Sequence, residues 1–136
     1  MIYLAGRIRQ NSRLLKASTA AMMGEADIAI NSVLLGDSEL MRVFVDGMID
    51  PARLSSAEFN RFGVAMGTMM RAFHRSFALA RGSGIDDSLW ETELRSYSYV
   101  VQSAGGQRWW IAYRNIFSDA FARFIDGLIR EAEVAR

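Results

Sequence analysis

Residues 54–59, Leu-Ser-Ser-Ala-Glu-Phe, decide the fold class of this chain. The hydroxyl of Ser55 can accept a hydrogen bond from the amide of Glu58, and the Glu58 carboxylate can reach back to the Ser55 amide. Leu54 and Phe59 can pack together across the same turn. This pattern is typical of a capped helix start, and similar joints recur along the chain. We therefore predict an all-α fold.

Helical periodicity extends from this joint in both directions. The spacing of apolar residues predicts a long first helix over about 4–35. Asp37 then caps a short second helix, for which Gly47 is the expected stop. The third helix is expected to begin at the Ser55 capping box and to end at Gly82.

The second half of the chain predicts three more helical segments. Asp86 is the expected cap of a fourth helix, which Gly105-Gly106 stops. A short segment with Trp109 follows, and Ser118 opens the last helix. The expected architecture is one domain over residues 1–136, a bundle of five to six helices that run mostly antiparallel because the connections are short.

Composition limits the classes of function. A length of 136 residues with 51% hydrophobic residues suits one domain with a real core. The absence of cysteine excludes disulfides, thiolate catalysis and cysteine-ligated metals. A net charge of +1 provides no general attraction for nucleic acid, so we expect no nucleic-acid partner.

Catalytic and metal-binding patterns are missing from the sequence. His74 is the only histidine, and no acidic residue lies between Glu58 and Asp86 to join it in a metal site. No Gly-x-Ser-x-Gly motif or Glu-x-x-His pair occurs. We predict no catalytic residue, no metal and no cofactor, and we favour a protein that is not an enzyme.

Two features of the later helices are candidate contact sites. Gly63 and Gly67 lie on one face of the third helix and predict a close helix crossing, with the first helix as the expected neighbour. Trp109 and Trp110 diverge by about 100° on a helix, so both are buried only if two different neighbours receive them. The alternative is one ring exposed as a pocket wall or interface anchor. The adjacent cations that could stack there or bind an anion are Arg108 and Arg114.

The start of the chain is basic. Four cations precede the first acid, Glu25: Arg7, Arg9, Arg13 and Lys16. They form either a solvated face or a contact with an anionic membrane surface or partner. Asn11 and Ser18 interrupt the apolar stripe at heptad spacing, and such polar residues can set the register of a paired helix. Homo-oligomerisation through the first helix is therefore an expected mode of association.

Five segments are similar to an uncharacterised group of bacterial proteins in which one N-terminal transmembrane helix runs into a small helical domain: 2–13, 71–73, 85–90, 105–110 and 117–126. The resemblance implies a membrane-associated bundle that is cytoplasmic, at the inner face of the membrane, with residues 1–16 as a membrane-proximal stub. The span itself is missing from this sequence. The resemblance implies no activity.

Two functional hypotheses follow. The first is a non-enzymatic, membrane-proximal interaction or sensory module. The second is a bundle that binds a small apolar or anionic ligand among aromatic and methionine side chains of the third to fifth helices. A cavity of about 300 Å³ or more beside Trp109 or Trp110 would favour the second hypothesis.

Overall fold

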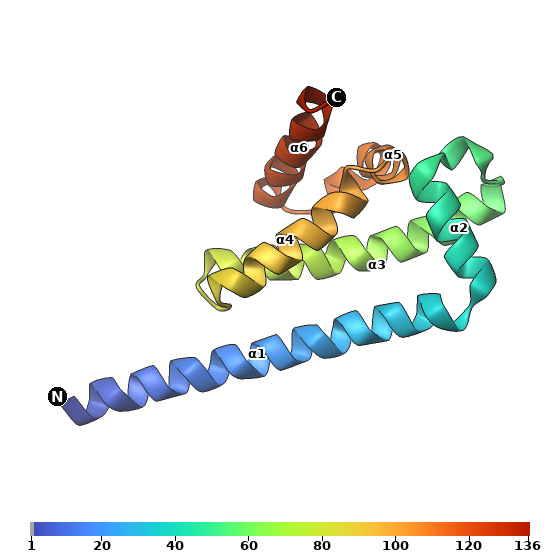
Figure 1. Cartoon of the computed structure of the whole chain (residues 1–136). Helices are drawn as coiled ribbons and strands as arrows, with labels where there is room; N and C mark the ends of the chain where they lie inside the picture. The colour runs from blue at the N-terminus through green and yellow to red at the C-terminus, as the bar shows by residue number, and fades with distance from the viewer. Residues whose placement is uncertain (1) are drawn as a thin grey trace.

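The computed structural model describes residues 2–136 and confirms the all-α prediction. Over this range the chain forms six α-helices and no strand (Figure 1). The helices are α1 (Ile2–Gly36), α2 (Ser38–Ile49), α3 (Ser56–Arg81), α4 (Asp87–Val101), α5 (Ala104–Tyr113) and α6 (Asp119–Val134). Two short 3-10 helices, η1 (Pro51–Arg53) and η2 (Arg114–Ile116), lie in the connections.

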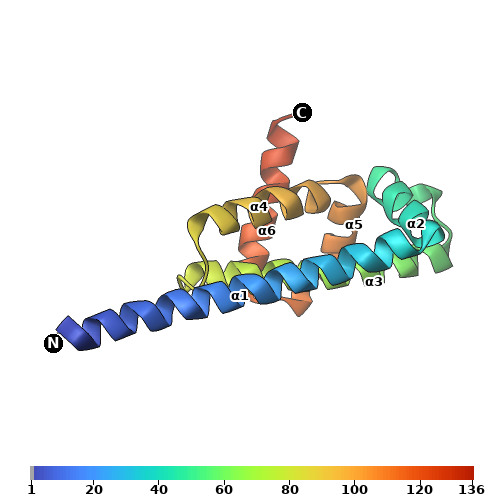
Figure 2. The same cartoon turned by 60° about the horizontal axis from the view of Figure 1, so that its bottom comes forward.

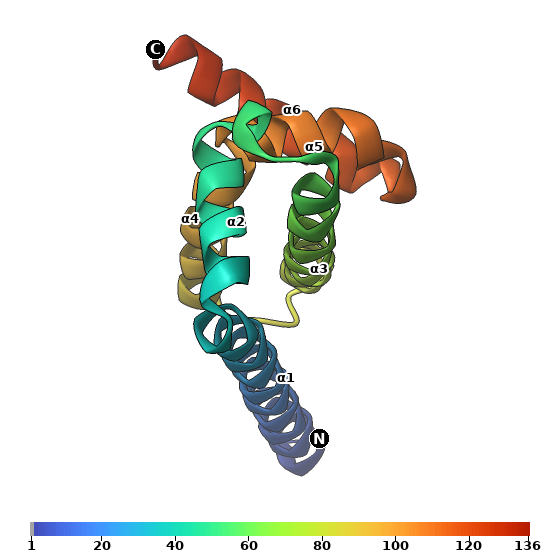
Figure 3. The ribbon, with the colours of Figure 1, turned by 90° about the vertical axis from the view of Figure 1, so that its right-hand side faces the viewer.

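The helices α1, α3 and α4 make the body of the bundle. The chain runs along α1, returns along α3 and reverses again in α4, whereas α2 and α6 cross this direction (Figure 1). Seen from the end of the bundle, α1 lies on one side of the α3–α4 pair, and α5 and α6 lie on the other (Figure 3). The core therefore forms where α3 meets its neighbours on both sides.

Side-chain caps begin three of the helices where the sequence predicts them. The Asp37 carboxylate accepts bonds from two amides at the start of α2, 3.0 and 3.1 Å away. Ser55 accepts from the Glu58 amide at 3.2 Å, and Glu58 accepts from the Ser55 amide at 2.8 Å, which completes the capping box. Ser118 accepts from the Phe121 amide in α6. Each bond satisfies an amide that the helix itself leaves unpaired.

An aromatic cluster forms the centre of the core. The Phe73 ring on α3 is fully buried and stacks on Tyr97 of α4, with ring centres 4.9 Å apart. On α6, Phe121 and Phe124 meet the same ring edge-on at 5.7 and 5.8 Å. Such offset and edge-on pairs add to the stabilisation from apolar burial. This cluster fixes α3, α4 and α6 against one another.

The expected helix stops at three glycines are wrong. Gly47 lies inside α2, which continues to Ile49, and Gly105 and Gly106 lie in the first turn of α5. A Cβ on Gly105 would collide with the Gly47 carbonyl oxygen, and a Cβ on Gly106 would collide with the carbonyl oxygen of Val100. These glycines allow two backbones to approach closely, instead of ending helices.

The first half of α1 projects from the body. Residues 2–15 are all exposed, and in Figures 1 and 2 this part of the helix runs past the loop that joins α3 to α4. The projection begins at Lys16, whose amino group lies 3.6 Å from the Asp86 carboxylate in that loop.

Asp86 precedes α4 as predicted, but its side chain makes no capping hydrogen bond.

Candidate ligand groove and first-helix surface

Trp109 and Trp110 are both buried, with 3% and 2% of their surfaces exposed, because two different neighbours receive them. Trp110 packs toward Phe117, which follows η2, and toward Phe121 in the first turn of α6, with ring centres 5.4 and 6.0 Å away. Trp109 points instead toward α3. The predicted divergence of the two rings therefore places one in the core and the other at the wall of a groove.

The Trp110 indole takes part in a structural network. Its Nε1–H donates to Oδ1 of Asp126 at 2.8 Å, and Arg114 donates to Oδ2 at 2.7 Å. Burial opposes ionisation of Asp126, but the bonds from Arg114 and Trp110 outweigh it and lower the pKa of this carboxyl. Because both polar groups already have a partner, Trp110 and Arg114 fasten α5 to α6 and do not face a ligand site.

Trp109 lies over the two glycines of α3. A Cβ built on Gly63 would lie 3.5 Å from Trp109 Nε1, and one on Gly67 would lie 3.5 Å from Trp109 Cζ2. The expectation that α1 packs on these glycines is therefore wrong. Their missing side chains make room for an indole from α5, which a propensity argument on α3 alone does not identify.

A groove of about 500 Å³ opens beside Trp109 between α3, α5 and η2. Its walls are mostly apolar or aromatic, and the residues that line it are Phe59, Asn60, Gly63, Val64, Gly67, Arg71, Trp109, Tyr113 and Ile116. The volume lies within the usual range for small-molecule pockets.

Two donors lie at this groove without a protein acceptor among the described residues. No described residue accepts a hydrogen bond from Trp109 Nε1–H. Every fully buried side-chain nitrogen or oxygen in residues 2–136 has a hydrogen-bond partner, so an N–H without a partner must be accessible. The Trp109 N–H is therefore open to the groove. Arg71 is exposed and makes no ion pair within the described part of the chain. Its Nη1 would lie 3.4 Å from a Cβ on Gly67, so it lies near the edge of the Trp109 ring.

Arg71 is a residue that the sequence analysis missed. The sequence does contain an indication of its place, because Arg71 follows Gly67 by one helical turn and so lies on the same face of α3. The predicted cation Arg108 lies instead over the Phe59 ring, 4.6 Å from its centre, and lines an adjoining hollow with Asn60. Arg108 therefore contributes positive charge at the end of the Trp109 groove without lining it.

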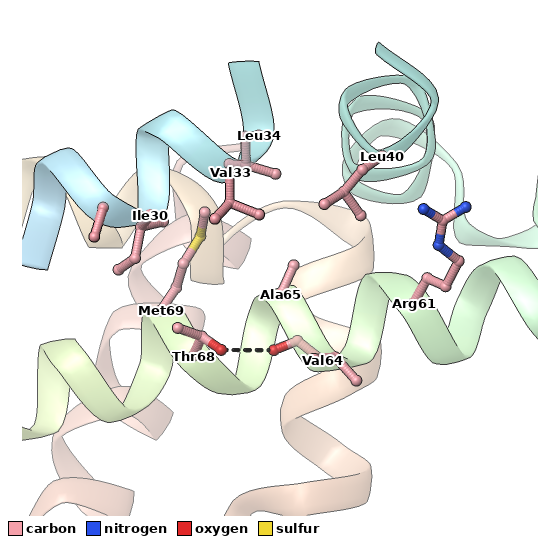
Figure 4. Close-up of a pocket in the computed structure, with 10 residues that line it drawn as sticks. Ile30, Val33, Leu34, Leu40, Arg61, Val64, Ala65, Thr68 and Met69 are labelled. Atoms are coloured by element: carbon pink, nitrogen blue, oxygen red, sulfur yellow. Dashed lines mark hydrogen bonds between the residues drawn. The ribbon is translucent and has the colours of Figure 1, made fainter. Parts of the chain in front are cut away.

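A second groove lies on the neighbouring face of α3, between α1, α2 and α3, and Val64 lines both grooves (Figure 4). It has a volume of about 480 Å³, and in Figure 4 the side chains of Ile30, Val33, Leu40 and Met69 converge on it. Arg61 lies at its edge and is paired with Asp37 at 3.4 Å. This groove is almost entirely apolar, and its only cation already has a partner.

The predicted basic surface lies on the projecting half of α1. Arg7, Arg9, Asn11 and Arg13 are all exposed, and none of these arginines has an acidic partner within residues 2–136. Lys16, in contrast, is partly buried and paired with the loop before α4. The structure therefore places all the predicted residues except Lys16 on one exposed segment, and this segment does not adjoin the Trp109 groove.

Two acidic residues, Glu93 and Asp27, lie together beneath the second half of α1, and the sequence pattern does not predict this pair. Glu93 of α4 is 6% exposed. Burial raises its pKa to about 7, with a further contribution from the nearby negative charge of Asp27 on α1. Tyr97 donates to Oδ1 of Asp27 at 3.3 Å, and burial raises the pKa of this phenol. Arg75 lines the same cavity of about 290 Å³.

His74 has the surroundings of a structural histidine. Its Nε2 lies 3.0 Å from the Ser118 hydroxyl, and its ring stacks on Phe121 with centres 4.6 Å apart. Burial lowers the pKa of the imidazole. No group of three or more His, Asp or Glu side chains in residues 2–136 is arranged to hold a metal ion.

Comparison of the chain with protein-family models, curated proteins and solved structures found no match. None of the helices described over residues 2–136 is long and apolar enough to cross a membrane. The resemblance to bacterial proteins with an N-terminal transmembrane helix is therefore wrong. It rested on short apolar segments, which many unrelated helical bundles share because the same periodicity builds their cores.

Proposed function

We propose that this chain is a small-ligand-binding helical bundle, and that its site is the groove beside Trp109. The observation that carries the proposal is a cavity of about 500 Å³ with an open indole N–H and an unpaired guanidinium, Trp109 and Arg71, at one place. A cavity of this size beside Trp109 supports the ligand-binding hypothesis.

The chemistry of the groove indicates the class of ligand. Aromatic faces at Phe59, Trp109 and Tyr113 favour a flat apolar body, which stacks on such rings. Arg71 and the Trp109 N–H are both donors, so they favour an anionic group at one end of the ligand. We therefore expect an aromatic or aliphatic carboxylate, sulfonate or phosphate ester.

Nuclear magnetic resonance of the indole N–H groups tests this site directly. The probe is 8-anilinonaphthalene-1-sulfonate, which carries an aromatic body and one anionic group. We expect the Trp109 indole signal, assigned with the variant Trp109→Phe, to shift on titration. The Trp110 signal should stay in place, because its N–H is held by Asp126. A titration that moves neither signal, or both equally, contradicts the proposal.

Two variants separate this groove from the apolar groove beside α1. Arg71→Gln removes the guanidinium and should weaken probe binding roughly tenfold, since a hydrogen bond to a charged group contributes about 1.5–3 kcal/mol. Arg61→Gln removes a similarly exposed arginine on the same helix and should leave the affinity unchanged. Equal affinities for wild type and Arg71→Gln would contradict a role for Arg71.

An interaction module is a second candidate function, and one observation favours it. The projecting half of α1 exposes large apolar side chains, including Leu4, Ile8 and Leu15, that no other part of the described chain covers. Exposed apolar surface of this kind is typical of a contact with another molecule.

A further inference from the structure

An apolar stripe, interrupted by Asn11 and Ser18, follows α1 from end to end and lies open to solvent. It consists of Leu4, Ile8, Leu15, Met22, Ala29 and Val33, which share one helix face by their spacing. The five larger side chains in this set are between 58% and 68% exposed. The face beside the stripe is covered by the bundle from Thr19 to Leu34, both of which are buried.

The stripe leads into the apolar groove between α1 and α3. Ala29 and Val33 form part of the α1 wall of that groove, and Val64 of α3, which is 73% exposed, lies on the opposite wall (Figure 4). The uncovered stripe and the uncovered groove are thus one surface. A partner that covers it must be long, apolar along one side and narrow enough to lie beside α1, as a helix is.

The stripe is complementary to itself when reversed. Read in either direction these six exposed members are separated by four, seven, seven, seven and four positions, whereas Ala26, on the same face, is partly buried. In an antiparallel pair, Leu4 lies opposite Val33, Ile8 opposite Ala29, and Leu15 opposite Met22. A two-fold interface has this property, since residue i contacts j while j contacts i.

Charge favours the same direction of pairing. Residues 2–18 carry the exposed Arg7, Arg9 and Arg13 and no acid, whereas residues 19–36 carry the exposed Glu25 and no base; Lys16 and Asp27 already have partners within the chain. An antiparallel pair sets the basic half of one helix along the acidic half of the other. Parallel pairing would set each half against its like, which costs energy.

We infer that two copies of this chain pair through antiparallel α1 helices, centred between Ser18 and Thr19. Leu4 and Ile8 of each copy then cover the α1–α3 groove of the other. Asn11, opposite Ala26, places a polar group in the seam, and a polar residue there fixes the register. The pairing deepens the interaction role and is independent of ligand binding beside Trp109.

Sedimentation of the full chain tests the pairing. We expect a dimer for wild type, and a dissociation constant raised at least about tenfold by Leu15→Glu, because pairing would bury an unpaired charge. Ile28→Glu is the matched control, since Ile28 is equally exposed, at 67%, but lies off the stripe. A wild-type chain that remains monomeric overturns the inference, whatever other molecule binds α1.

Cysteine cross-linking tests the direction, and the chain suits it because it contains no cysteine. Under mild oxidation the double variant Ile8→Cys/Ala29→Cys should form disulfide-linked dimers. Neither single variant should, because identical positions lie about 30 Å apart along an antiparallel pair. Cross-linking by Ile8→Cys alone would mean parallel helices and would overturn the antiparallel arrangement while leaving self-association intact.

Discussion

At the scale of single residues, the buried Glu93 makes stability depend on pH. The ordinary pKa of a glutamate is about 4.5, and in the folded chain burial and Asp27 raise that of Glu93 to about 7. Below pH 4.5 the carboxyl is protonated in both the folded and the unfolded chain, so it does not change the free energy of unfolding. Between these values the unfolded chain loses the proton while the folded chain keeps it, so the free energy of unfolding falls as pH rises. Above pH 7 the loss is constant.

The variant Glu93→Gln should remove this loss, because an amide resembles the protonated carboxyl in shape and stays neutral. We expect little change in the free energy of unfolding at pH 5 and an increase on the order of 1–2 kcal/mol at pH 8. Urea denaturation at both pH values measures it. Glu91→Gln, an exposed position on the same helix, is the control. The same change for Glu93→Gln at both pH values would mean that Glu93 is ionised throughout.

At the scale of elements, the approach of α5 to α2 depends on glycine. We expect Gly105→Ala to lower the free energy of unfolding by about 2–3 kcal/mol, because the added methyl group meets the backbone of Gly47 and not a flexible side chain. Gly24→Ala, in open space on α1, should raise it by up to about 1 kcal/mol through helix propensity. Thermal or urea unfolding compares the two. A tolerated Gly105→Ala would mean that α2 and α5 can move apart at little cost.

The same glycines show what the sequence can and cannot predict about elements. The caps at Asp37, Ser55 and Ser118 were predicted because every atom of a cap lies within a few residues of the chain. Gly47 and Gly105 were misinterpreted because their role is a contact between segments far apart in sequence. A glycine favours a helix stop locally, and only the tertiary contact distinguishes a stop from a close approach.

For the candidate site, too, the sequence predicts some features and not others. The sequence predicts that Trp109 and Trp110 diverge, because adjacent residues on any helix do so, but it leaves open which of the two rings borders a groove. Arg71 and the two glycines beneath the Trp109 ring belong to α3. Their part in the site depends on which helix packs against α3. That information was absent from local periodicity, which led to α1 being assigned to the place that α5 occupies.

At the scale of the whole molecule, the projecting half of α1 should report on pairing through its amide exchange. In a monomer, residues 2–15 have no tertiary contacts and should exchange far faster than the core segment 66–73 of α3. In wild type we expect exchange of residues 2–15 at least about tenfold slower than in Leu15→Glu. Ile28→Glu should match wild type. Equally fast exchange in all three proteins would show that this half stays unpartnered.

The departure of α1 from the body at Lys16 also has a geometrical consequence. The free segment is a stiff rod of about 20 Å, at the usual rise per helical residue. Because this segment is continuous with the part of α1 that packs in the core, it acts as a spacer. A molecule bound at its N-terminal end is held at a set distance and orientation from the body. In an antiparallel pair the two bodies would thus lie toward opposite ends of the paired helices, each beside the free tip of the other copy.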